Sequence, residues 1–260
     1  MVVPIHDIVQ QLLQADAQRA PLPPLTATYP GLTPQDAYAI QLAWVAARTA
    51  AGARVAGKKI GLTNPKIQEM FGVHEPDYGH LLDTMLVESG DTIPLSSLVQ
   101  PRVEAEVAFM LRRDLQGPGV TRDDVLEATE CVLPALEIID SRIRDWKIAL
   151  PDTIADNASS GRVVVNRAAA RSPAGLDLAA IVMTLERNGV EISRGVSAAV
   201  QGHPATAVAW LANKLAEFSV VLKAGELIMS GAITGAFPVS PGDHFHAQLS
   251  ELGTVGVTFQ

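Results

Sequence analysis

The sequence predicts an α+β fold in which a helical N-terminal layer, residues 1–55, precedes a β-rich body, residues 56–260. Three observations predict it. Helical patterns fill the first part of the chain, and the Pro-rich connector between them is too short to separate domains. From Arg54 onward, short apolar runs broken by Gly and Pro are typical of strands. Helices between those runs are too few for a regular βαβ array, so we expect one compact domain overall.

The helix signals are strongest near the N-terminus. Residues 5–18 carry a helical pattern, and a second helix is predicted over residues 34–51. Thr33 is the candidate N-cap of this second helix, a proline occupies its first position, and Asp36 completes a capping box. Gly52 ends the run.

Strands dominate the rest of the chain, with few helices between them. Thr121 is predicted to cap a short helix over residues 121–129, and a longer helix begins near Pro204. Asn188 and Gly189 lie between two alternating arms, which is a strong signal for a hairpin with a two-residue turn. The other predicted strands are residues 54–63, 102–113, 131–140, 223–235 and 243–259.

Composition excludes several classes of function. The net charge of −8 and the absence of a Lys/Arg cluster argue against nucleic-acid binding. No apolar run is long enough to cross a bilayer, so no membrane association is expected. The first residues lack the basic start and apolar block of a signal peptide, so we expect a cytoplasmic protein.

Two acids interrupt an apolar strand in "PRVEAEVAFML". Side chains alternate along a strand, so Glu104 and Glu106 project from one face, roughly 7 Å apart along the backbone. Glu137 lies in a second apolar strand-like run. Like charges at 4 Å repel by roughly 4 kcal/mol at an effective dielectric near 20, so a proton, paired cations or a metal ion must compensate. Three such carboxylates suit Mg²⁺ or Mn²⁺; the alternative is exposed acids on an edge strand.

A lysine pair and three polar stretches extend the candidate site. Lys58 and Lys59 are adjacent, so one ammonium points inward, where it could move protons beside the carboxylates; two solvated lysines are the alternative. "HEPDYGHL" places Asp77 in a Pro/Gly-punctuated loop, either near a ligand or as a turn former. "IADNASSG", residues 154–161, is a plain turn or a loop for a small anion, and "SGAITG", residues 230–235, allows close backbone approach.

Four segments together resemble one enzyme family: "GKKIGLTNPKIQEMFGVHEPDYGHL", "QPRVEAEVAFML", "LPALEIIDSRIRDWKI" and "ADNASSG". From about residue 35 to the C-terminus, the chain resembles the 2-hydroxypentadienoate hydratases (2-keto-4-pentenoate hydratases). These are grouped with the 4-oxalocrotonate decarboxylases in the fumarylacetoacetate hydrolase superfamily. The resemblance implies a mixed β-roll or barrel-like body with flanking helices, like the C-terminal domain of fumarylacetoacetase. It also implies a bound Mg²⁺ or Mn²⁺ and a homo-oligomer.

The resemblance also implies residue roles. Glu104, Glu106 and Glu137 match the family's metal ligands, and Lys59 and Asp77 match its acid–base positions. The residues expected to line the substrate pocket are Leu62, Asp156, Ser159, Ser160, Ser230 and Thr234.

The implied activity is hydration of 2-hydroxypenta-2,4-dienoate to 4-hydroxy-2-oxopentanoate in the meta-cleavage degradation of aromatic compounds. Decarboxylation of 4-oxalocrotonate in the same metal pocket is the alternative. Asp77 is retained as in the hydratases, whereas "IMSGAIT" lies close to the decarboxylase version of its loop. Hydrolysis of an acylpyruvate and a non-catalytic scaffold are more distant interpretations. A pathway aldolase is a possible partner.

Overall fold

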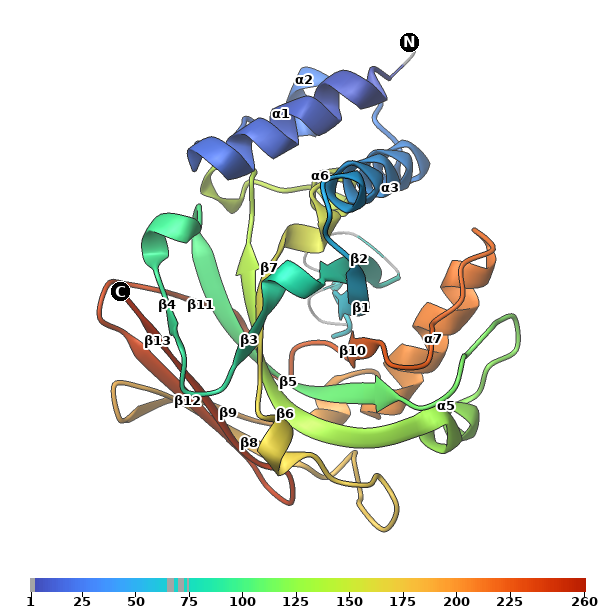
Figure 1. Cartoon of the computed structure of the whole chain (residues 1–260), viewed down its shortest axis with the longest axis vertical. Coiled ribbons are helices and arrows are strands. Elements are labelled where there is room, and N and C mark those ends of the chain that lie inside the picture. The colour runs from blue at the N-terminus through green and yellow to red at the C-terminus, as the bar shows by residue number, and fades with distance from the viewer. Residues whose placement is uncertain (1–2, 65–67, 70–72, 74) are drawn as a thin grey trace.

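In the computed structural model, two β-sheets pack beside an N-terminal layer of helices (Figure 1). The structure describes residues 3–64, 68–69, 73 and 75–260. The segment "PKIQEMFGVH" of the family motif therefore lies largely outside the described residues. Among the described helices, none combines the length and apolar character that a membrane span requires.

Both predicted N-terminal helices form, and a short further helix, α2, lies within the Pro-rich connector between them. The capping box at Thr33 is present, since its hydroxyl accepts a hydrogen bond from the backbone N–H of Asp36 and the Asp36 carboxylate accepts one in return. In Figure 1 these helices lie above the body of the molecule. The three helices are α1 (Ile5–Gln18), α2 (Leu25–Thr28) and α3 (Pro34–Ala50).

The larger sheet is mixed and strongly curved, as Figure 1 shows. Its strands follow the order β2-β1-β10-β5-β6-β7-β3, and β11 pairs with the start of β5. The pairs β1–β10 and β3–β7 are parallel, and the other pairs of this sheet are antiparallel. The strands are β1 (Val55–Gly61), β2 (Asp77–Leu82), β3 (Leu86–Glu88), β5 (Pro101–Leu111), β6 (Thr129–Asp140), β7 (Ser160–Val165), β10 (Leu227–Met229) and β11 (Phe237–Pro238).

The smaller sheet has the order β4-β13-β12-β8-β9. The predicted hairpin is confirmed: Arg187 pairs with Val190, and Asn188 and Gly189 between them have φ values of 54° and 78°. Positive φ at both central residues is the signature of a type I′ turn. The strands are β4 (Thr92–Ile93), β8 (Val182–Arg187), β9 (Val190–Val196), β12 (His244–Leu249) and β13 (Gly253–Phe259).

Further helices connect and cover the sheets. Thr121 caps the first of them with a second capping box, and the His203 side chain accepts a hydrogen bond at the start of the last. The α-helices are α5 (Arg122–Ala128), α6 (Leu150–Ala155) and α7 (Pro204–Ala216). The 3₁₀ helices are η1 (Asp83–Met85), η2 (Leu95–Ser97), η3 (Arg144–Trp146), η4 (Asn157–Ser159), η5 (Arg167–Ala169) and η6 (Ser197–Ala199).

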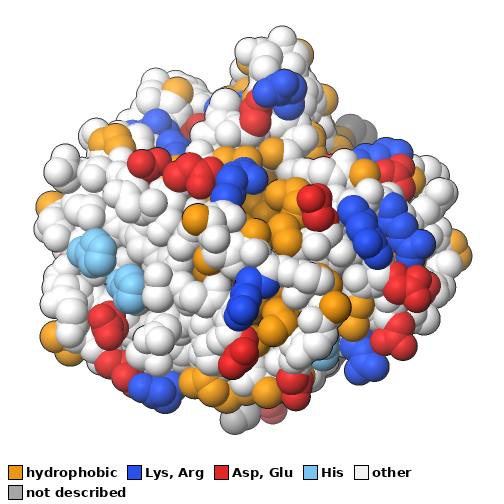
Figure 2. All heavy atoms as spheres, turned by 60° about the horizontal axis from the view of Figure 1, so that its bottom comes forward, with side chains coloured by type: hydrophobic (Ala, Val, Ile, Leu, Met, Phe, Trp, Pro, Cys, Tyr) orange, Lys and Arg blue, Asp and Glu red, His pale blue; other side chains and the backbone are white. Residues whose placement is uncertain are grey.

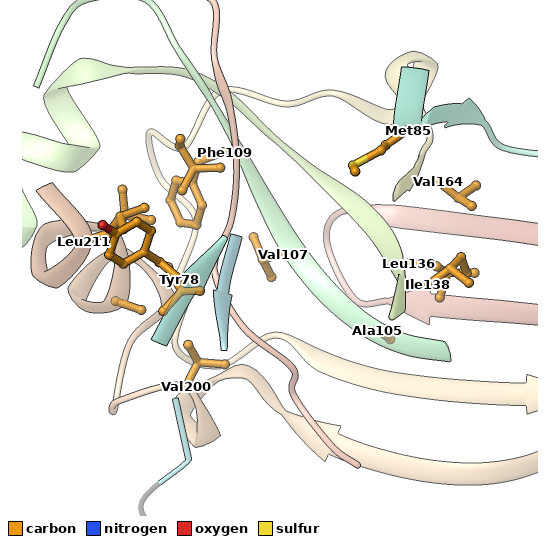
Figure 3. Close-up of a cluster of buried hydrophobic side chains, with 14 of the residues drawn as sticks. Tyr78, Met85, Ala105, Val107, Phe109, Leu136, Ile138, Val164, Val200 and Leu211 are labelled. Atoms are coloured by element: carbon orange, nitrogen blue, oxygen red, sulfur yellow. The ribbon is translucent and has the colours of Figure 1, made fainter. Parts of the chain in front are cut away.

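One face of the larger sheet packs into the main core together with the smaller sheet and the helices. Val103, Ala105, Val107 and Phe109 are fully buried on that face of β5, as the alternation predicts. Figure 3 shows three of them together with side chains from the neighbouring strands. The residues between them project to the opposite face. The acids of β5 and β6 therefore lie on the side away from the main core.

Candidate metal centre and active site

Three carboxylates converge on the face of the larger sheet opposite the core. Glu104 and Glu106 come from β5 and Glu137 from β6, where the antiparallel register places Glu137 directly opposite Glu104. One carboxylate oxygen from each residue lies within 4.8 Å of the others. Glu106 and Glu137 are buried, and Glu104 is partly buried. The strand pairing thus brings together acids that the sequence separates by more than thirty positions.

Three of the buried carboxylate oxygens lack a hydrogen-bond donor among the described residues. Within the described part of the chain, Glu106 Oε1 and both carboxylate oxygens of Glu137 accept no hydrogen bond. The backbone N–H of Gly231 donates to Glu106 Oε2 at 2.8 Å. Buried charges without partners are costly, so a site of this kind requires either protons or a cation. An all-carboxylate donor set fits a hard divalent ion such as magnesium or calcium, and suits zinc poorly.

The pKa values of the three acids reflect this burial. Burial and then the Glu137 charge raise the pKa of Glu104 to about 7. Burial and the neighbouring carboxylates raise the pKa of Glu106 well above its usual value. Burial also raises the pKa of Glu137, although Lys59 opposes the shift. Without a cation, the cluster therefore holds protons near neutral pH.

Lys59 lies beside the carboxylates. Its Nζ is 3.3 Å from Glu137 Oε1 and donates a hydrogen bond to the Ala158 carbonyl at 3.0 Å. Burial alone would lower the pKa of the Lys59 ammonium, but Glu137, Asp77, Glu104 and Glu106 together raise it above its ordinary value. Lys59 therefore stays protonated in the resting site.

Asp77 approaches Lys59 from the adjacent strand. It is the first residue of β2 and pairs with Gly61 of β1, so the predicted loop placement is wrong. Gly61 makes the approach possible, because a Cβ there would stand 2.2 Å from Asp77 Oδ1 and 3.5 Å from Lys59 Nζ. The Thr153 hydroxyl donates to Asp77 Oδ2 at 3.2 Å. Burial raises the pKa of Asp77, while the Lys59 charge opposes the rise.

The other lysine of the pair is also buried. Lys58 points to the opposite side of β1 and forms an ion pair with Glu226, with Nζ and Oε1 2.8 Å apart. The alternative of two solvated lysines is therefore wrong. The prediction that one of the two reaches the carboxylates fits Lys59.

A cavity of about 280 Å³ opens onto Lys59, Asp77 and Glu104. Among the residues expected to line a substrate pocket, it contains Leu62 and Ser159. Both have left-handed backbones, with φ values of 54°, which is uncommon for residues with a side chain and concentrates at functional sites. Ser159 Oγ is buried and has no hydrogen-bond partner among the described residues. Much of the remaining lining is apolar: Ile60, Ile139, Trp146, Ile148, Ala158, Ala232 and Ala236.

The other expected pocket residues lie outside this lining. Asp156 forms a buried ion pair with Arg142. The hydroxyls of Ser160 and Ser230 donate to backbone carbonyls at 2.7 Å. Thr234 Oγ1 is buried and has no partner in the described part of the chain, and it lies next in sequence to the cavity residue Gly235. Asp156, Ser160 and Ser230 are thus engaged in holding the backbone around the site.

The "ADNASS" segment is more regular than the predicted loop. It begins at the end of α6, continues as η4 and enters β7 at Ser160. The Asn157 side chain accepts from the His80 N–H and donates to the His80 carbonyl, both at 2.8 Å, so the segment is fixed to β2. Gln41 of α3 donates to the carbonyls of Tyr78 and Ile154, both at 2.9 Å. The helical layer therefore supports the strand that carries Asp77.

Sequence reasoning did not select Arg102 and Trp146, which line the same cavity. The guanidinium carbon of Arg102 lies 4.5 Å from the centre of the Trp146 ring. Arg102 occupies the position two residues before Glu104, so the alternation in "PRVEAEV" contained the signal for it. No local pattern indicated Trp146, because the η3 segment that presents it has a left-handed backbone at Asp145 and Trp146.

A carboxylate cluster that could hold a divalent cation, an adjacent lysine–aspartate pair and a small, largely apolar cavity in an α+β fold together form the site of an enzyme. Residues 62–260 match the model of the fumarylacetoacetate (FAA) hydrolase C-terminal family. A 2-hydroxyhexa-2,4-dienoate hydratase of Comamonas testosteroni is 50% identical over 252 residues, which cover 96% of this chain and 95% of that protein. A 2-hydroxypent-2,4-dienoate hydratase of Pseudomonas putida is 49% identical over 217 residues, covering 83% and 97%.

A solved structure is also closely similar. The 4-oxalocrotonate decarboxylase from Pseudomonas putida G7, complexed with magnesium and adipate, superposes with a TM-score of 0.96 at 35% identity. The match covers 100% of this chain and 99% of that one. A second structure of that decarboxylase contains calcium and acetate. The chain belongs to the fumarylacetoacetate hydrolase superfamily and, within it, to the hydratase/decarboxylase family.

Proposed function

We propose that this chain is a hydro-lyase that adds water to 2-hydroxypenta-2,4-dienoate and forms 4-hydroxy-2-oxopentanoate in aromatic meta-cleavage degradation. The observation that carries this proposal is the position of Lys59 and Asp77 beside the carboxylate cluster in one cavity. The near 50% identity to two dienoate hydratases supports the choice of reaction.

Glu104, Glu106 and Glu137 would hold a divalent cation, with Mg²⁺ or Mn²⁺ proposed as the physiological ion. When bound, this ion supplies Lewis-acid polarisation of the substrate carboxylate and the adjacent C2 oxygen. Lys59 keeps its ammonium beside Glu137, where it also attracts an anionic substrate. The chain thus provides the ligands, a fixed positive charge and a cavity with a largely apolar lining.

Lys59 and Asp77 are the proposed proton-transfer residues. The overall reaction moves a proton from the C2 hydroxyl, places one proton on C5 and one on C3, and adds hydroxide at C4. Asp77 is suited to exchange a proton because burial raises its pKa above the ordinary value of an aspartate. Lys59 keeps a proton on Nζ, and both Lys59 and Asp77 line the cavity. Gly61 lies against both groups and has no side chain to separate them from the cavity. Ser159 Oγ, which lacks a described partner, is positioned to orient the attacking water.

Decarboxylation of 4-oxalocrotonate is the second candidate. Its support is the 0.96 TM-score to a decarboxylase over the whole chain. The hydratase assignment has the stronger support, because identity to the two hydratases is 49–50% and identity to the decarboxylase is 35%.

The test offers both substrates to the purified, magnesium-loaded protein. Loss of dienoate absorbance with formation of 4-hydroxy-2-oxopentanoate, and little CO₂ release from 4-oxalocrotonate, is the expected outcome. Faster CO₂ release than hydration would favour the decarboxylase. Full hydration by exhaustively chelated protein would refute the metal-dependent account.

The proposal extends to assembly and location. We infer a homo-oligomer that acts in the cytoplasm, with a pathway aldolase as a possible partner. Val190 of β9 is 65% exposed and Val196 is 44% exposed, so this edge of the smaller sheet offers apolar contact area. Figure 2 shows hydrophobic side chains among charged ones on the lower face of the molecule. Light scattering with size-exclusion chromatography measures the mass in solution, and a mass near 27.5 kDa would refute the oligomer.

A further inference from the structure

We infer that Arg102, supported by the ring of Trp146, binds the carboxylate at C1 of the substrate. Nothing in the assigned metal ligands or acid–base pair requires this residue. The inference rests on the proposed function, because it assumes that a 2-oxo acid or its enol occupies the cavity. Arg102 would thereby position the substrate by binding its charged end.

The first support is the position of Arg102. Arg102, Glu104 and Glu106 occupy alternate positions of β5, so their side chains leave the same face of the strand. Arg102 pairs with Ile139 of β6, and both residues line the cavity. Arg102 is therefore next to the cation site, one step along the strand toward its N-terminal end.

The second support is its lack of partners. Two cations, Lys59 and Arg102, belong to the described cavity lining. Lys59 already contacts Glu137 and the Ala158 carbonyl. The guanidinium of Arg102 forms no hydrogen bond or ion pair with any residue that the structure describes, and its described contact is the stacking on the Trp146 ring. A guanidinium remains charged at all physiological pH values and carries five N–H donors, so an unused one beside a cavity is suited to a planar carboxylate.

The third support is the way the guanidinium is held. It lies 4.5 Å from the centre of the Trp146 ring, and the indole Nε1 donates to the Gln100 carbonyl at 3.0 Å. The ring is thereby fixed, and it restricts the guanidinium without using its donors. Such a stacked arginine is ordered before the ligand arrives, so less conformational entropy is lost on binding.

Charge balance agrees with a monocarboxylate. Four ionised acids, namely the three ligands and Asp77, are balanced by a divalent ion together with Lys59 and Arg102. Without Arg102 the loaded cavity would be negative and would repel an anionic substrate. The apolar lining offers space for the uncharged diene. The charge of Arg102, which no described acid pairs with, is therefore available for the one carboxylate of the substrate.

The test uses 2-oxopentanoate, a saturated 2-oxo acid that cannot be hydrated at C4, in calorimetric titrations of magnesium-loaded protein. Arg102→Gln should weaken binding about 10- to 100-fold, as expected for lost charged hydrogen bonds. The affinity of Arg102→Lys for 2-oxopentanoate should lie between those of Arg102→Gln and the wild type, because lysine keeps the charge and loses the bidentate fork. Lys147→Gln is the matched control: it removes one positive charge at an exposed neighbour of Trp146 outside the cavity lining.

Two further measurements are the magnesium affinity, titrated without the 2-oxo acid, and the melting temperature. We expect both quantities to change little in Arg102→Gln. If magnesium affinity falls as far as 2-oxopentanoate affinity, Arg102 acts through the metal site and the inference is wrong. If only a dicarboxylate such as 2-oxohexanedioate loses affinity, Arg102 binds the far end of the substrate and the assignment to C1 is wrong.

The same experiment separates this inference from the proposed function. If the wild type hydrates the dienoate and Arg102→Gln binds 2-oxopentanoate equally well, the role of Arg102 is refuted and the hydratase stands. If the wild type neither binds 2-oxopentanoate nor consumes the dienoate, the proposed function fails, and the inference fails with it.

Discussion

Gly61→Ala should reduce turnover by displacing Asp77. The added Cβ would stand 2.2 Å from Asp77 Oδ1, whereas ordinary carbon–oxygen contacts are near 3.3 Å. The carboxylate must therefore move by about 1 Å from the added methyl, and misplacement of that size in an active site costs about 100-fold in rate. The backbone of Gly61 is extended in β1, so alanine itself is tolerated there. We expect a correspondingly lower kcat with a cooperative melting transition.

The double variant makes the reasoning specific. Asp77→Ala removes the group that the new methyl would displace, so adding Gly61→Ala to it should cost little further activity. Coupled effects of this kind are non-additive when two changes act through one contact. Dienoate absorbance assays on the two single variants and the double variant measure the coupling. Full activity of Gly61→Ala, or additive losses in the double variant, would show that Asp77 does not work from the position seen here.

Three other perturbations test different parts of the site. Glu106→Gln should abolish detectable hydration and weaken magnesium binding at least about 10-fold, measured by calorimetry, because it removes one charged ligand; unchanged magnesium affinity would contradict the ligand assignment. Metal-free protein should lose stability as pH rises between 4.5 and about 7, because the folded-state pKa of Glu104 is raised by burial and the folded protein then holds the extra proton. Added magnesium should reverse this loss in thermal melts at pH 8, and a melting temperature that rises with pH without metal would refute it. Gln41→Leu should lower the free energy of unfolding by about 2–5 kcal/mol, since two buried carbonyls lose their donor. The exposed Gln35→Leu, on the same helix, is its control in denaturant titrations, and equal stability of the two variants would show that the helical layer and the body are not coupled.

Local signals predicted local structure well. The helix that begins at Pro34, the cap at Thr121 and the turn at Asn188 depend on a few neighbouring residues, and each forms as expected. The alternation in β5 also predicted which face carries Glu104 and Glu106, because the other face is uniformly apolar. Where the physical cause lies within one element, the sequence contains it.

Partners that are distant in sequence explain the differences. Asp77 lies in a strand because β2 pairs with β1, although the segment has Gly and Pro and shows no alternation, since it is buried throughout. Lys58 is buried because Glu226, 168 positions away, neutralises it. Asp156 faces Arg142 and not the cavity. In each case the contact that decides the position of the residue is between segments distant in sequence. The residues next to it in the sequence do not indicate that contact.

The chemistry of the site depends on the packing of the opposite face. Shifting β5 by one residue against β6 would bring Glu104 and Glu106 into the core and expose Val103 and Phe109. That slip is prevented because the apolar residues of β5 are fully buried among neighbouring strands. The same register sets Glu104 opposite Glu137 and sends Arg102 toward the cavity. The packing of the larger sheet therefore fixes the separation of the carboxylates. A cation that binds between them would meet ligands that are already in place, so little reorganisation of the protein would oppose its binding.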